Sequence, residues 1–86
     1  MTNASNRVRL NTMKFEIYLL HRDEIFVKYI DVPSVIAFFG RSFAIAKSYS
    51  VMARRGEKAI FIEKVTDLVS LNKKLTEFMV ATSSQQ

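Results

Sequence analysis

The chain has 86 residues, a formal net charge of +5 and no cysteine. A chain of this size holds one domain, since a second would be too small for its own core, and no apolar run reaches the roughly 18 residues of a membrane span. The absence of cysteine excludes disulfides and thiolate chemistry, as expected for a cytoplasmic protein. The polar, aperiodic residues 1–11 predict a flexible leader, followed by a single domain over 12–82 and a frayed tail over 83–86.

A hairpin is expected to open the domain. Residues 12–20 alternate apolar and polar side chains, which predicts a strand, although the alternation of Val8 and Leu10 with arginines allows an earlier start. The charged residues 21–24 form a break of hairpin length, and residues 25–30 predict the second strand. The core face of that strand is expected to hold Ile25, Val27 and Tyr29, and the opposite face Phe26, Lys28 and Ile30.

The long stretch 33–56 is predicted to be a helix, because at about 100° per residue most of its apolar side chains fill one broad arc. Asp31 or Ser34 is expected to cap its N-terminus, and Gly56 to follow its C-terminus. Gly40 is unfavourable inside a helix, so an alternative is a separate turn over 33–39 with Ser42 capping a shorter helix.

The rest of the chain predicts one more strand, 57–65, and a second helix that Thr66 and Asp67 cap. The fold class is therefore α+β with the order β-β-α-β-α. We expect a mostly antiparallel three-stranded sheet in the order 2-1-3, with 1-2-3 as the alternative, and both helices on the face that bears Phe15 and Ile17. The apolar arc of the long helix is broader than one sheet face needs, which favours a dimer.

Motifs for catalysis or cofactor binding are lacking. Two glycines sixteen residues apart cannot form a phosphate-binding loop, and one histidine without cysteine cannot build a zinc site. The tripeptide that begins at His21 matches the kinase catalytic loop, but the asparagine required five residues after the aspartate is replaced by Lys28. We therefore expect a non-enzymatic protein without cofactor or metal, and His21 as a solvated turn residue. An enzyme with its site at a dimer seam is the least favoured interpretation.

The basic residues are concentrated in residues 41–58, where five cations face a single acid, Glu57. Such a cluster is expected to attract phosphate, an anionic membrane surface or an acidic protein, or else to be a solvated face that keeps the domain soluble. We favour nucleic-acid binding by a homodimer through one face of the long helix. The residues predicted to bind are Arg41, Lys47, Arg54, Arg55 and Lys58, with help from Arg7 and Arg9 in the leader.

The alternative function is a protein-interaction module, either an adaptor or an inhibitor of a larger protein. The sheet face away from the helices would hold Lys14, Tyr18, Leu20, Phe26, Lys28 and Ile30, together with either Ile60 and Ile62 or Ala59 and Phe61. Aromatic side chains beside lysines can stack on bases, but the aliphatic residues fit a protein contact or dimer seam better. The predicted interface residues are Tyr18, Phe26 and Ile30.

Overall fold

The computed structural model describes residues 14–41 and 43–83. The predicted leader over 1–11, the start of the predicted first strand and residues 84–86 lie outside this range. The described elements in chain order are β1 (Phe15–His21), β2 (Glu24–Tyr29), α2 (Val32–Arg41), α3 (Phe43–Ala46), β3 (Tyr49–Arg55), β4 (Lys58–Ile62) and α4 (Leu68–Ser83). Helix α4 includes Ser83, the first residue of the predicted tail.

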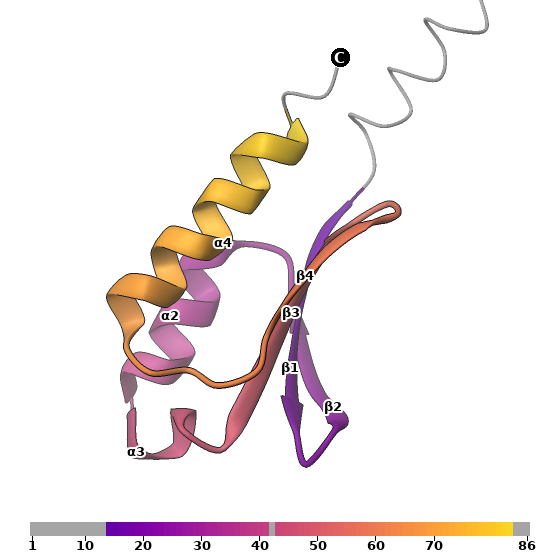
Figure 1. The fold of residues 1–86 in the computed structure, drawn as a ribbon. Helices are drawn as coiled ribbons and strands as arrows, with labels where there is room; N and C mark the ends of the chain where they lie inside the picture. The colour runs from indigo at the N-terminus through magenta and orange to yellow at the C-terminus, as the bar shows by residue number, and fades with distance from the viewer. Residues whose placement is uncertain (1–13, 42, 84–86) are drawn as a thin grey trace, which may run out of the picture.

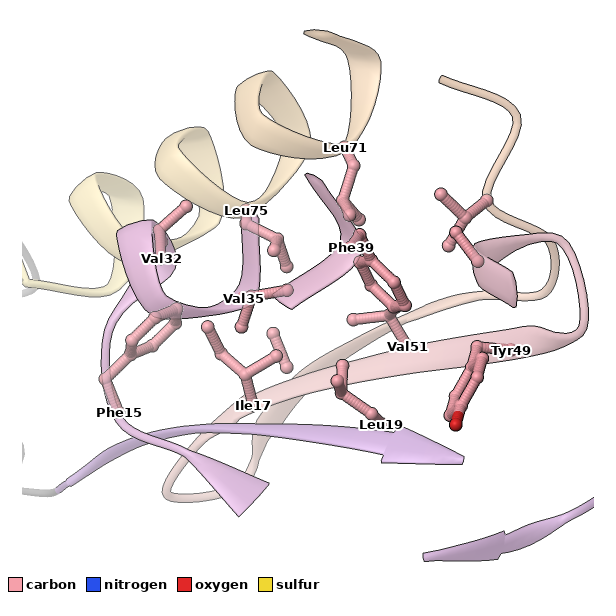
Figure 2. Packing of buried hydrophobic residues seen from close by; sticks show 13 residues of the cluster. Phe15, Ile17, Leu19, Val32, Val35, Phe39, Tyr49, Val51, Leu71 and Leu75 are labelled. Atoms are coloured by element: carbon pink, nitrogen blue, oxygen red, sulfur yellow. The ribbon is translucent and has the colours of Figure 1, made fainter. Parts of the chain in front are cut away.

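The fold is an α+β arrangement of two layers, as Figure 1 shows. One layer is a four-stranded sheet in the order β2-β1-β3-β4, and every neighbouring pair of strands is antiparallel. Helices α2 and α4 pack against each other on one side of this sheet. The predicted placement of the helices over Phe15 and Ile17 is confirmed, because both side chains are buried in the core between the layers (Figure 2).

The predicted hairpin is confirmed, with Arg22 and Asp23 as its two-residue turn. Both residues have positive φ angles, 55° and 67°, which is the pattern of a type I′ turn. Neither residue is glycine, so the turn is formed against an unfavourable backbone preference. The strands remain in register up to an irregularity between Leu19 and Leu20.

That bulge changes which side chains of β2 face the helices. Val27 and Tyr29 pack on the core as predicted. Ile25 pairs with Leu20, so it lies on the far face with that residue. The ring of Phe26 instead reaches the helix side, where its centroid is 5.6 Å from that of Tyr49. The predicted faces of Ile25 and Phe26 are therefore wrong, because one extra residue in a strand reverses the alternation.

The single helix predicted over 33–56 is wrong. Helix α2 ends at Arg41, the short α3 follows, and residues 49–55 form strand β3. The alternative with a break in this stretch is nearer to the structure, but its second helix is only four residues long. The strand forms because its side chains also alternate with period two, with Tyr49, Val51, Ala53 and Arg55 buried. Pairing along the whole of β1 then satisfies its backbone.

The extra strand also corrects the predicted sheet. The neighbour of β1 is β3, whereas the strand predicted over 57–65 is β4, which pairs with β3 at the edge. Gly56 therefore does not end a helix. It lies in the β3–β4 turn with a φ of 62°, in the left-handed region that glycine adopts at little cost.

Both helix caps form as expected. The Ser34 backbone N–H donates to Asp31 Oδ1 at 2.8 Å, and the Ser70 backbone N–H donates to Asp67 Oδ1 at 2.6 Å. Each aspartate thus satisfies one amide that has no partner inside the helix. The bond from the Ser70 amide is the main cause that lowers the pKa of Asp67 below its ordinary value.

Replacement of each of the two glycines by alanine is predicted to change the free energy of unfolding in opposite directions. A Cβ at Gly40 in α2 would meet no atom within 4 Å, so Gly40→Ala should raise the free energy of unfolding by about 0.5–1 kcal/mol. Gly56→Ala should lower it by about 1 kcal/mol, because alanine is strained at positive φ. Urea unfolding followed by circular dichroism measures both changes. Destabilisation by Gly40→Ala would contradict a helical Gly40.

Candidate functional site

The sheet face opposite the helices, hereafter the open face, is the main candidate surface. Its members follow from the strand register and from the alternation with the buried residues. They are Glu16, Tyr18 and Leu20 on β1, Ile25 and Lys28 on β2, Ser50, Met52 and Arg54 on β3, and Ala59 and Phe61 on β4. Of the two pairs that the sequence offers for this face, Ala59 and Phe61 are therefore the ones on it. Ile60 and Ile62 pack toward the helices.

One row of side chains crosses all four strands of this face. Tyr18 lies opposite Lys28 on one side and Met52 on the other, and Met52 lies opposite Phe61. Phe61 is 57% exposed, since it lies on the face away from the described helices. The row therefore places two aromatic rings, a flexible thioether and a cation side by side on the open face, where Lys28 and Phe61 are exposed and Tyr18 and Met52 are half-buried.

Glu16 organises the charges beside this row. Its Oε1 accepts hydrogen bonds from Arg54 Nη2 at 3.1 Å and from the Tyr18 hydroxyl at 3.0 Å. Its Oε2 accepts one from Lys28 Nζ at 3.4 Å. The Arg54 guanidinium also lies 5.8 Å from the centroid of the Tyr18 ring. One carboxylate thus joins cations from the strands on either side of it.

These donors hold the pKa of the Glu16 carboxyl below its ordinary value, with the Arg54 bond as the main cause and the Tyr18 bond second. Both cations remain about half exposed. Neither ion pair is buried enough to contribute much to stability. Their stronger effect is to fix where the positive charges lie on the face.

The predicted nucleic-acid-binding residues do not share one surface. Arg54 and Arg55 are consecutive on a strand, so their side chains point to opposite faces. Arg54 is exposed on the open face, whereas Arg55 is only 9% exposed and lies 5.4 Å from the ring of Phe15 on the helix side. Its Nε has no hydrogen-bond partner among the described residues.

The other three predicted residues lie at two ends of the sheet. Lys58 pairs with Arg55 beside the β3–β4 turn. Arg41 ends α2 and Lys47 follows α3, near the far end of β3 (Figure 1). A seven-residue strand separates these ends, a distance of roughly 20 Å. The predicted line of cations along one helix face does not exist, because residues 49–55 are not helical.

The predicted interface residues also separate. Tyr18 lies on the open face as expected. Phe26 belongs to the aromatic cluster on the helix side, with Phe38 and Tyr49. Ile30 directly follows β2 and is 67% exposed. Whether Tyr18, Phe26 and Ile30 contact a partner stays a prediction.

Two members of the open face, Glu16 and Met52, are not evident as site residues from the sequence, whereas Arg54 is among the predicted nucleic-acid-binding residues. The sequence places Glu16 on the polar face of the first predicted strand without giving it a role. It places Met52 and Arg54 on the long predicted helix, whereas both lie on strand β3. A signal for Met52 and Arg54 is present, since residues 49–55 alternate with period two. The link between Glu16 and Arg54 joins positions 38 apart in sequence, and no local pattern reveals it.

A groove and a histidine are two further features of the described surface. The groove, of about 560 Å³, runs between β4 and α4 and is lined by Ile60, Phe61, Ile62, Glu63, Lys64, Lys74, Glu77 and Phe78. His21 ends β1, and its ring centroid lies 5.2 Å from that of Tyr49. Across the described residues, no three acidic or histidine side chains gather closely enough to hold a metal ion.

None of the helices within residues 14–41 and 43–83 is both long and apolar enough to cross a membrane. Comparison of the chain with known protein families, with curated proteins and with solved structures finds no match.

Glu16 is predicted to make stability depend on pH. Because its pKa is lower in the folded than in the unfolded chain, its contribution is complete above the unfolded pKa and disappears as the pH falls through the folded pKa. The difference in free energy of unfolding between the wild type and Glu16→Gln should therefore shrink with acidification over that interval. Glu57→Gln, in the exposed β3–β4 turn, controls for net charge. An equal difference at every pH would contradict the ion pairs.

Proposed function

We propose that this protein is a non-enzymatic binding module that holds single-stranded nucleic acid on its open face. The observation that carries the proposal is the row from Lys28 through Tyr18 and Met52 to Phe61 across the sheet. Exposed aromatic rings stack on bases of any sequence, and neighbouring cations hold the phosphate backbone.

The charges around the row support this function. Arg54 lies directly beside Tyr18 and keeps donors free besides the one that binds Glu16, since a guanidinium has five N–H groups. The exposed Lys14 precedes β1 at the same end of the sheet as Arg54, so it continues the positive surface there. The whole chain carries +5, which favours encounter with a polyanion.

The test is fluorescence anisotropy with unstructured labelled DNA and RNA strands of about 4–16 nucleotides, the range that one small binding fold covers. Phe61→Ala should weaken binding roughly 5- to 150-fold, because a stacked base is worth about 1–3 kcal/mol. Arg54→Met should weaken binding and lower the slope of log affinity against log salt by about one, as expected for one lost phosphate contact. Equal affinity at all salt concentrations would refute the proposal.

The chain offers a matched control in the next residue. Arg55→Met removes the same charge from the same strand, but the side chain is buried on the opposite face. It should leave the affinity near that of the wild type, apart from a small effect of net charge. Glu16→Gln should instead tighten binding, because it removes the negative charge that competes with phosphate for Arg54 and Lys28. If Arg54→Met and Arg55→Met weaken binding equally, the open face is not the site.

A second candidate function is a protein-interaction module that uses the same face. It is favoured by the aliphatic corner next to the β1–β2 turn, where Leu20 lies opposite Ile25 and Ile25 is 61% exposed. This candidate predicts no binding of oligonucleotides at low salt. It also predicts that the Ile25→Glu variant no longer binds the protein partner. The Ile45→Glu variant should still bind it, since Ile45 is similarly exposed but lies on α3.

A further inference from the structure

The two edges of the sheet differ in how they resist pairing with another strand. At one edge, β2 carries the charged Glu24 and Lys28 and is irregular where it pairs with β1. Charges and bulges are the usual protection of an edge strand. At the other edge, β4 is regular over its whole length and reads Lys-Ala-Ile-Phe-Ile, without proline or an interior charge.

The outer side of β4 is therefore open for backbone pairing. Among the described residues, β4 has a strand on one side only, so one row of its backbone donors and acceptors faces outward. The groove of about 560 Å³ lies next to this edge, between β4 and α4. Ile60, Ile62 and Phe78 line it with apolar surface, and each is only partly buried.

We propose that two copies of this chain pair through antiparallel β4 strands about a two-fold axis. Full overlap of the five-residue strands places Ile60 opposite its own copy, Ala59 opposite Phe61, and Lys58 opposite Ile62 of the partner. Antiparallel pairing of identical strands requires an axis perpendicular to the sheet, which keeps both helix layers on the same side. The two grooves then merge, and the Ile60 side chains meet inside.

The charges at the rim of the groove fit a second copy. Lys74 and Glu77 lie one turn apart on α4, and both line the groove on its helix side. A two-fold axis sets the two α4 helices antiparallel, so Lys74 of each copy faces Glu77 of the other. The charges of this surface are thus complementary to those of a second copy. A strand from another protein that carried only positive or only negative charge would match just one of the two side chains, so a second copy is the better occupant.

This dimer would join the two open faces into one. Because the axis is perpendicular to the sheet, the open faces lie on the same side of a continuous sheet, and Phe61 lies opposite Ala59 of the partner. Pairing of the two copies does not depend on nucleic-acid binding, since it rests only on β4 and α4.

The absence of cysteine allows a direct test. In Ile60→Cys the single thiol lies on the two-fold axis, within the roughly 4.4–6.8 Å between Cα atoms that a disulfide requires. Mild oxidation should convert most of this variant to a covalent dimer. Ile45→Cys, exposed on α3, and Ile25→Cys, exposed on the open face, should remain largely monomeric on non-reducing gels. Faster cross-linking of Ile25→Cys than of Ile60→Cys would place the contact on the open face and overturn the proposal.

A charge exchange on α4 tests the contact without changing β4. Light scattering should give the wild type twice its 9.9 kDa mass. Glu77→Lys places like charges opposite each other and should weaken the dimer at least tenfold, whereas the double variant Lys74→Glu/Glu77→Lys should restore it. Both positions are exposed, so circular dichroism should be unchanged in each variant. A monomeric wild type, or no recovery in the double variant, would overturn the proposal.

The two measurements distinguish the dimer from the proposed function. A monomer that binds oligonucleotides refutes the dimer alone. A dimer that does not bind them refutes only the proposed function.

Discussion

The structure depends on strand β1, which pairs with β3 along its whole length and with β2 from Ile17 to His21. Its side chains at 15, 17 and 19 are buried against the helices, and Ile17 and Leu19 are wholly inaccessible to solvent. Because side chains alternate along a strand, its even-numbered side chains lie on the open face. One alternating segment therefore sets both the core and the surface that remains exposed.

That arrangement leaves more apolar surface outside than two layers can cover. A chain this short buries roughly 60–65% of the surface that its unfolded form exposes. Helices α2 and α4 both pack on the same face of the sheet, so neither covers the open face. Phe61, Ile25 and Ile30 consequently remain more than half exposed, and β4 keeps a free edge among the described strands. A composition of 49% hydrophobic residues in so small a domain favours association on physical grounds.

The elements that could be predicted from sequence are those with a single local periodicity. Strand β1 and helix α4 each have one, and the Asp67 cap agrees with the start of α4. Residues 49–55 carry two periodicities at once, since Tyr49, Met52 and Ala53 fit a helix arc while Tyr49, Val51 and Ala53 fit a strand. Residues 49–55 form a strand because they pair with β1, whose residues lie more than 25 positions earlier in the chain. Phe26 was misplaced for a related reason, because a bulge in a ladder has no signature in local hydrophobicity.

Glu16 shows how the same non-local pairing controls the surface chemistry. Its carboxylate is acceptable on this strand because Arg54 and Lys28 arrive from the flanking strands, and both cations are ordered because the carboxylate is there. An anion that binds the open face must compete with Glu16 for these donors. Protonation of Glu16 releases them, so the affinity of the face for anions and the pKa of this carboxyl are thermodynamically linked. The residue that aligns the charges of the sheet would therefore also limit the affinity of the open face for a polyanion.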